Sequence, residues 1–360
     1  LQHDHDYKIQ YKARFGDNGF YHGRLARKLV QGVRAAGGIW TLQDLAQYRV
    51  VERQPLRGEY RGMRITSAAP PSSGGVALIA MLNMLSAYEL DSLDAATRTH
   101  VVIESMRRAY RDRAGYLGDS DFVEVPVERL TGRAHARALG QSIELDRATP
   151  SSALPGKTIE PEGEDTTHFS IIDADGNRVA ATLSINDPFG ACVVPPGTGV
   201  LLNDEMDDFS AKPGEPTVYG LVGAEANAIE PGKRPLSSMS PTFVESEQGV
   251  AIIGTPGGSR IITMVLLGIL DLADGNGTDS WVSLPRFHHQ YLPDSVQFEP
   301  AAFDEALQQQ LRERGHTLKP LDSSYGNMQA IYWDKQTGKV TPASDPRGVG
   351  DARVGLIRLK

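Results

Sequence analysis

The pattern of apolar residues changes near residue 165, and this change restricts the possible folds more than any other feature of the sequence. Before it, apolar residues recur at a helical spacing, as Leu25, Leu29 and Val33 do. The helices expected there cover residues 21–35, 42–48, 76–90 and 95–117, with a strand-like stretch at 57–67. After it, strands are expected at 168–173, 178–185, 242–245, 249–254, 328–333, 339–342 and 355–359, and helices at 260–273 and 301–314. Helices and strands mixed in this way predict a layered α/β or α+β fold.

A stretch without apolar periodicity, residues 148–165, separates the two parts. Seven of its 18 residues are Pro, Gly or Ser and four more are acidic, which is typical of a loop or mobile tail. The formal net charge also differs between the parts, being +1 over residues 1–165 and −9 over residues 166–360. A structureless stretch of this length inside a compact protein usually has a functional reason.

Composition excludes several classes of protein. No run approaches 18 consecutive apolar residues, so no membrane-spanning helix is expected. The net charge of −8 argues against a nucleic-acid partner. Cys192 is the single cysteine, which excludes an internal disulfide, and we expect it to be a small buried residue. The histidines show no metal-binding spacing, so we expect neither a metal nor another cofactor.

The expected helix at 95–117 carries a run of arginines on one side. A charge run on a helix is most often a face in contact with solvent. We therefore expect a solvated basic face formed by Arg107, Arg108, Arg111 and Arg113.

Thr166 stands at the start of an expected strand, directly after the acidic stretch that ends in Asp165. A hydroxyl at such a position suits an N-terminal nucleophile. If the bond between Asp165 and Thr166 is cut, Thr166 gains a free α-amino group with a reference pKa of about 7.7–8.0. That amine can take the proton from the Thr166 hydroxyl, so no histidine is needed. A Thr-Thr pair at a strand start is, by itself, weak evidence, because it is far more often ordinary β-structure.

Three further segments carry polar groups suited to binding. Residues 203–208 place four acids in six positions, and residues 235–241 present hydroxyls between two prolines. Residues 254–260 form a glycine-rich turn before a helix, where exposed backbone N–H groups can hold an oxyanion. Each segment alone is also compatible with an ordinary loop.

Taken together, these segments resemble a known family. The matching stretches are P-P-S-S-G-G (70–75), Y-L-G-D-S-D-F-V (116–123), D-T-T-H-F-S (165–170), S-I-N-D-P-F-G (184–190), G-T-G-V-L-L-N-D-E-M-D-D-F-S (197–210), P-G-K-R-P-L-S-S-M-S-P-T (231–242), T-P-G-G-S-R-I-I-T (255–263) and P-R-F-H-H-Q (285–290). In these motifs and their order, the chain from about Phe20 onward is similar to the γ-glutamyltranspeptidase family of N-terminal nucleophile hydrolases.

The resemblance implies a four-layer αββα sandwich of the α+β class, in which residues 1–165 and 166–360 form one intertwined core. It also implies a zymogen that cleaves itself between Asp165 and Thr166. Residues 1–165 would then be the C-terminal part of a large subunit, and the small subunit would start at the nucleophile. Thr166 would attack glutathione or another γ-glutamyl compound, and water, an amino acid or a peptide would take the γ-glutamyl group from the acyl-enzyme.

The catalytic residues follow from the same resemblance. Thr166 would be the nucleophile, and the backbone amides of Gly257 and Gly258 match the oxyanion hole of the family. Ser184 stands where the family has a second threonine beside the nucleophile. It keeps the hydroxyl but lacks the methyl group that restricts the rotamer.

The substrate-binding residues form two sets. Asn186, Glu205 and Asp208 match residues that hold the substrate α-amino group, which suits an ammonium because charge-assisted hydrogen bonds are strong. Ser237 and Ser238 match the hydroxyls that bind the α-carboxylate. Residues 210–221 resemble the lid of bacterial members, with Tyr219 as its gate.

Two alternatives remain beside the γ-glutamyltransferase. One is a glutaryl- or cephalosporin-type acylase of the same fold, and the other is a processing-defective homologue without enzymatic activity. The family also has an upstream arginine for the α-carboxylate that no residue here matches, so a protein that begins at Leu1 is expected to bind its substrate weakly. Bacterial members are usually exported, which implies a periplasmic or secreted protein.

Overall fold

The structure, a computed structural model, describes residues 16–154, 165–210 and 225–355. The chain divides into two compact units. One unit holds the residues up to Arg53 together with Ile185–Glu205, and the other holds Gln54–Ser184 together with the residues from Met206 onward. None of the helices in the described residues combines the length and the apolar character that are needed to cross a bilayer.

The first unit is a small helical body. Its helices are α2 (Asn18–Tyr21), α3 (Gly23–Ala35) and α4 (Leu42–Gln47). The expected apolar stripe of α3 is buried, and Leu25 and Leu29 pack with Leu45 of α4. Thr41 caps α4, because its side chain accepts a hydrogen bond from the Asp44 amide while the Asp44 side chain accepts from the Thr41 amide.

The second unit contains the remaining helices and all of the strands. Its helices are α5 (Gly74–Leu85), α6 (Ala95–Tyr116), α7 (Val127–Leu130), α8 (Arg133–Gln141), α9 (Ile261–Ala273), α10 (Thr278–Ser283) and α11 (Glu305–Glu313). Its strands are β1 (Leu56–Tyr60), β2 (Met63–Ser67), β3 (Asp165–Ile172), β4 (Arg178–Asn186, whose last two residues belong to the first unit), β5 (Thr242–Glu245), β6 (Gly249–Gly254), β7 (Phe287–His288), β8 (Val296–Phe298), β9 (Leu318–Pro320), β10 (Gln329–Asp334) and β11 (Val340–Ser344).

A six-stranded sheet is the centre of this unit. Its strand order is β1-β2-β5-β6-β10-β11, and neighbouring strands are antiparallel throughout. Strands from before residue 165 therefore pair directly with strands from after it. β3 and β4 form a separate two-stranded ribbon, and β7, β8 and β9 form a three-stranded sheet. Mixed helices and strands of this kind are an α+β fold, as predicted.

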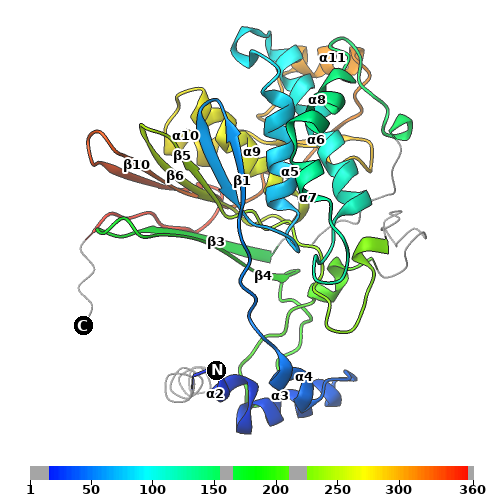
Figure 1. The fold of residues 1–360 in the computed structure, drawn as a ribbon, viewed down its shortest axis with the longest axis vertical. Coiled ribbons are helices and arrows are strands. Elements are labelled where there is room, and N and C mark those ends of the chain that lie inside the picture. The colour runs from blue at the N-terminus through cyan, green and yellow to red at the C-terminus, as the bar shows by residue number, and fades with distance from the viewer. Residues whose placement is uncertain (1–15, 155–164, 211–224, 356–360) are drawn as a thin grey trace. The chain divides into compact units, whose positions relative to one another are not determined.

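Both faces of the central sheet are covered, which explains why β6 is buried along its whole length. Ile253 faces α9, since a Cβ atom on Gly268 would lie 3.9 Å from its side chain. The next residue, Gly254, faces the ribbon, since a Cβ atom there would lie 2.1 Å from the ring of His168. Figure 1 shows the β3–β4 ribbon on one side of the sheet and the helices α5, α6 and α9 on the other.

The prediction of a solvated basic face on α6 is wrong. Arg107, Arg108 and Arg113 are buried, and Arg111 is half-buried. The cause is long-range pairing: the Arg107 side chain contacts Glu104 of its own helix and also Asp294, which is 187 positions away in the sequence. The sequence of the helix alone does not indicate a partner so far away in the chain.

Two smaller expectations are also corrected. The first seven residues of the expected mobile tail, 148–154, are anchored, because the buried Ser151 donates its amide to Asp294 and its hydroxyl to the Tyr291 carbonyl. The rest of that tail before Asp165 lies outside the described residues. Cys192 is exposed rather than buried. It lies in a turn with a positive φ of 54°, which keeps it out of a packed element.

Candidate functional site

Thr166 lies near the start of β3 and is half-buried. Its hydroxyl Oγ donates a hydrogen bond to the Oγ of Ser184 on β4, at 3.1 Å. The structure thus brings together the predicted nucleophile and the hydroxyl predicted to support it, 18 residues apart in the sequence. The contact exists because β3 and β4 pair with each other in one ribbon.

His168 fixes the position of β3 relative to the central sheet. It lies on the same face of the strand as Thr166, because side chains two positions apart point the same way. Its ring is buried against Gly254, and its two nitrogens contact the hydroxyls of Thr182 at 2.8 Å and Ser170 at 3.1 Å. Burial lowers the pKa of His168 to about 4, so the ring is neutral near pH 7. His168 is a spacer between the two sheets, and glycine is required opposite it.

The glycine-rich turn follows β6 directly. Gly257 has a φ of 136° and Gly258 a φ of 56°, both in the region that side chains disfavour. A Cβ atom on Gly257 would also lie 2.6 Å from the methyl carbon of Met264. Among the described residues, the backbone amides of Gly257 and Gly258 donate no hydrogen bond. Free amides ahead of α9 are the arrangement that can stabilise an oxyanion.

Glu205 and Asp208 are the first and last residues of one short 3-10 helix. Residues three apart in such a helix lie on the same side, so the two carboxylates share a face. The Oε1 atom of Glu205 is buried and has no hydrogen-bond partner among the described residues. A buried carboxylate oxygen without a donor is costly, and an ammonium group of a ligand would satisfy it.

Asn186 ends β4 in a left-handed conformation, with a φ of 70°. It is buried, and its amide nitrogen lies 3.4 Å from the carbonyl oxygen of Asp204. The backbone amide of Asp187 donates to the Asp204 carboxylate at 3.0 Å. These contacts join Asn186 to the segment that leads to Glu205. Tyr219, the predicted gate, lies outside the described residues.

The Ser237–Ser238 segment is held by the loop at 70–75. The Ser73 amide and hydroxyl both donate to the Ser237 carbonyl at 2.7 Å, and the Ser72 hydroxyl donates to the Met239 carbonyl at 2.6 Å. The loop and the segment lie so close together that glycine is needed at position 74, where a Cβ atom would lie 2.2 Å from the hydroxyl oxygen of Ser240. The motif P-P-S-S-G-G is therefore a clamp for the predicted carboxylate-binding serines.

Asn227 is a site residue that the sequence analysis missed. Its side chain donates to the carbonyl of Asp208 at 2.7 Å and accepts from the amide of Leu236 at 3.0 Å. It is buried. One side chain thus joins the acidic segment to the residue directly before Ser237. Nothing in the local pattern around Asn227 signals this role, because both partners are distant in sequence.

Asp119 is a second missed residue, within the matched stretch 116–123. It is buried, and its carboxylate accepts hydrogen bonds from the amides of Asp121 at 3.1 Å and Arg234 at 2.8 Å. This contact holds the chain that leads to Ser237. The sequence analysis identified the stretch 116–123 but not the role of Asp119 within it.

One cluster has the composition of a metal site. His100, Glu104 and His316 are buried with possible ligand atoms within 4.8 Å of one another. However, His100 Nδ1 and His316 Nε2 lie 2.7 Å apart and share a hydrogen bond, and His100 Nε2 faces the Glu144 carbonyl. Glu104 in turn accepts from two arginines of α6. His316 Nδ1 has no hydrogen-bond partner among the described residues. The facing His100 and His316 nitrogens and the Glu104 carboxylate are occupied by the hydrogen bonds just described, so we assign the cluster to the core.

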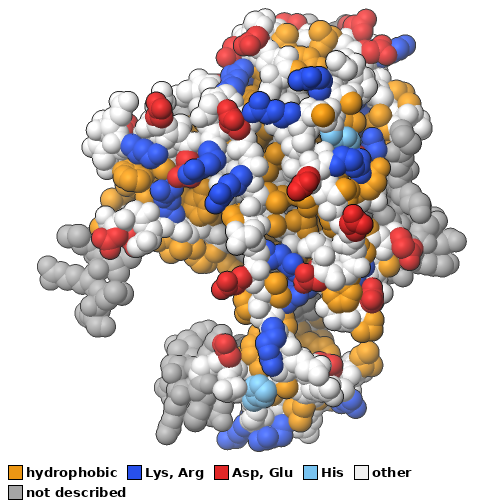
Figure 2. All heavy atoms as spheres, in the orientation of Figure 1, with side chains coloured by type: hydrophobic (Ala, Val, Ile, Leu, Met, Phe, Trp, Pro, Cys, Tyr) orange, Lys and Arg blue, Asp and Glu red, His pale blue; other side chains and the backbone are white. Residues whose placement is uncertain are grey.

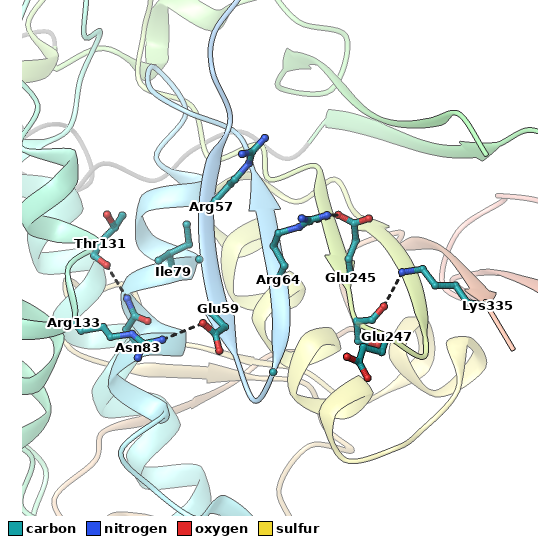
Figure 3. A pocket seen from close by; sticks show the side chains of 13 residues that line it. Arg57, Glu59, Arg64, Ile79, Asn83, Thr131, Arg133, Glu245, Glu247 and Lys335 are labelled. Carbon is teal, nitrogen blue, oxygen red and sulfur yellow. Dashed lines mark hydrogen bonds and ion pairs between the residues drawn. The ribbon is translucent and has the colours of Figure 1, made fainter. Parts of the chain in front are cut away.

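A cavity of about 760 Å³ lies elsewhere, beside β1, β2 and the end of β5. Figure 2 shows Lys and Arg side chains gathered on this face with acidic ones among them. Figure 3 shows how they pair, with Arg64 toward Glu245 and Arg133 toward Glu59. The cavity contains none of the predicted site residues, so its size does not make it the candidate site.

The chain is similar to known proteins over most of its length. The model of the gamma-glutamyltranspeptidase family matches residues 9–355. A glutathione hydrolase proenzyme of Escherichia coli is 43% identical over 348 residues, which cover 95% of this chain and 60% of that protein. A glutathione hydrolase proenzyme of a Pseudomonas species is 47% identical over 304 residues, covering 83% of this chain and 53% of that protein.

A solved structure gives the same picture of the fold. The crystal structure of a cephalosporin acylase from Bacillus halodurans superposes with a TM-score of 0.85 at 27% sequence identity. The match covers 99% of this chain and 63% of that one. The chain therefore spans about three fifths of the length of the Escherichia coli and Bacillus halodurans proteins.

Proposed function

Because this chain belongs to the gamma-glutamyltranspeptidase family, we propose that Thr166 is an N-terminal nucleophile released by self-cleavage of the bond between Asp165 and Thr166. The large subunit would then end at Asp165, and the small subunit would begin at Thr166. The single observation that carries the proposal is the hydrogen bond between the Thr166 and Ser184 hydroxyls at a strand start. It orients the Thr166 oxygen before and after cleavage.

The proposed reaction is γ-glutamyl transfer and hydrolysis. The free α-amine of Thr166 takes the hydroxyl proton as Oγ attacks the γ-carbonyl carbon of a donor such as glutathione. The tetrahedral oxyanion is held by the amides of Gly257 and Gly258. When it collapses, the C–N bond breaks, the leaving amine takes the proton, and an ester to Thr166 remains. Water or the amine of an amino acid or peptide then attacks that ester and releases Thr166.

Recognition of the γ-glutamyl group is proposed to need two sets of contacts. Glu205 and Asp208, with Asn186, would bind the α-ammonium, for which the unpartnered oxygen of Glu205 is well suited. Ser237 and Ser238 would bind the α-carboxylate through their hydroxyl protons. We further propose that the protein is exported to the periplasm or secreted.

A glutaryl-type acylase is the second candidate, and the close structural match to a cephalosporin acylase is the observation that favours it. A glutaryl group has the carboxylate but lacks the α-ammonium. The buried Oε1 atom of Glu205, which has no hydrogen-bond partner among the described residues, would then receive no ammonium. The γ-glutamyl donor supplies an ammonium for that oxygen, and we favour it for that reason.

Two measurements test the proposal. The intact mass of the purified protein should show two chains divided before Thr166, whereas the Thr166→Ala variant should remain one inactive chain. The purified enzyme should then release amine from a γ-glutamyl anilide faster than from the matched glutaryl anilide. A small subunit that starts at another residue would refute the processing step, and a preference for the glutaryl compound would favour the acylase.

A further inference from the structure

Arg113 on α6 is buried, with 4% of its surface exposed, and it reaches the predicted carboxylate-binding segment. Its Nε donates to the Ser73 hydroxyl at 2.9 Å and its Nη2 donates to the Ser238 hydroxyl at 3.0 Å. A guanidinium stays charged at neutral pH even when it is buried. Arg113 therefore holds a positive charge behind the hydroxyls of Ser73 and Ser238.

The hydroxyl groups of Ser73 and Ser238 differ in where their protons go. Ser73 accepts from Arg113 and uses its own proton on the Ser237 carbonyl. Ser238 accepts from Arg113, and no acceptor for the Ser238 proton lies among the described residues. A hydroxyl has one proton and two lone pairs, and the guanidinium occupies one of the lone pairs, so the proton remains available for donation. A carboxylate is the acceptor that such a donor suits best.

The same guanidinium also acts on Ser237. The Ser237 hydroxyl accepts from the Met239 amide at 3.1 Å, and no acceptor for its proton lies among the described residues. Its backbone is held by Ser73, which Arg113 holds in turn. Arg113 therefore contacts the Ser238 hydroxyl directly, and through Ser73 it holds the backbone carbonyl of Ser237. The charged donor makes the Ser238 hydroxyl a stronger donor, whereas for Ser237 it fixes the position of the backbone that carries the hydroxyl.

We propose that Arg113 is a positioning residue for the substrate α-carboxylate: it aims the hydroxyls of Ser238 and Ser237 at that group and supplies a positive charge behind them. This inference rests on the proposed γ-glutamyl function and extends it. It also explains two matched motifs at once, because the loop at 70–75 provides Ser73 and the segment 231–242 provides both serines.

The test uses the native, self-processed protein with Arg113→Met, Arg113→Lys and Ser73→Ala. Arg111→Met is the matched control, because Arg111 is on the same helix and contacts Asp112 instead. Each variant is assayed with a γ-glutamyl anilide and with the 4-aminobutanoyl anilide, which lacks only the α-carboxylate. Self-cleavage is followed on denaturing gels.

Arg113→Met should raise KM for the γ-glutamyl donor about tenfold or more while kcat changes less than threefold. The preference for the γ-glutamyl over the 4-aminobutanoyl donor should fall by a similar factor, and Arg113→Lys should recover part of it. Arg111→Met should behave as wild type in both respects. If Arg113→Met does not fold, Ser73→Ala decides the question, with an expected three- to tenfold rise in KM.

Three outcomes would overturn the assignment. These are an unchanged KM in a folded Arg113 variant, a loss confined to kcat, and an equal loss with both donors. If the wild-type protein turns over the γ-glutamyl donor and the variants match it, only the role of Arg113 is refuted. If the wild-type protein does not turn over that donor, the proposed function itself fails, and the inference falls with it.

Discussion

Asn227→Asp should weaken recognition of the substrate ammonium without removing the support of Ser237. The Asn227 side chain donates to the Asp208 carbonyl at 2.7 Å and accepts from the Leu236 amide at 3.0 Å. Aspartate keeps the acceptor for Leu236 but replaces the donor with an oxygen that faces another oxygen. Only the contact to the acidic segment is therefore lost.

The magnitude follows from that single contact. A typical intramolecular hydrogen bond contributes about 0.5–1.5 kcal/mol, and leaving a buried partner unsatisfied costs about 1–3 kcal/mol. A displacement of Asp208 that costs about 1–2 kcal/mol of binding corresponds to roughly a 5- to 30-fold loss in kcat/KM. Because a glutaryl donor has no α-ammonium, its kcat/KM should change much less.

The assay compares kcat/KM for the γ-glutamyl anilide and the glutaryl anilide in wild type and variant. Asn83→Asp is a suitable control, because the Asn83 side chain makes the same kind of contact, to the Thr131 carbonyl at 2.8 Å, beside the remote cavity in Figure 3. The control should leave the ratio of the two activities unchanged. If Asn227→Asp also leaves the ratio within twofold of wild type, the proposed link between Asn227 and ammonium recognition is refuted.

Three further predictions concern catalysis and stability. Gly257→Ala should slow self-cleavage and lower kcat by roughly 100-fold or more, because φ is 136° and the added Cβ meets Met264; near-normal turnover would contradict the oxyanion role. Ser184→Ala should slow acylation in single-turnover experiments by roughly three- to tenfold and Ser184→Thr should not, because only the former loses the hydrogen bond to Thr166. Burial lowers the pKa of His168 to about 4, below the value of about 6.5 in an unfolded chain. Between these two pKa values the unfolded state binds more protons than the folded state. Urea titrations should therefore show the free energy of unfolding falling by about 1.4 kcal/mol per pH unit for this residue, as the pH drops from about 6 to 4.5. A flat profile, or a rise, would contradict a buried neutral ring.

Much of the local structure could be predicted because it depends on neighbours in the sequence. The hairpin at 242–254 has the predicted bounds, and α3, α6 and α9 begin and end within two residues of the predicted positions. The Thr41 cap is local in the same sense, since a capping residue acts within one turn of its helix. These features are encoded by periodicity and by short-range hydrogen bonds.

The candidate site divides in the same way. Thr166, Gly257 and Gly258 could be predicted because a hydroxyl at a strand start and a glycine turn before a helix are local signals, and both lie in motifs that resemble the family. Asn227 and Arg113 carried no such signal. Arg113 even belonged to a run that was interpreted as a solvated face, and its contact with Ser238 joins residues 125 positions apart.

The sequence by itself determined which segments form most of the helices and strands and which family the chain resembles, and it predicted a candidate nucleophile. Only the tertiary structure decided which polar side chains support the site. The physical reason is that a buried charge or amide must find its hydrogen-bond partners wherever packing brings them. The tertiary structure brings Asn227 into contact with Asp208 and Leu236, and Arg113 into contact with Ser238.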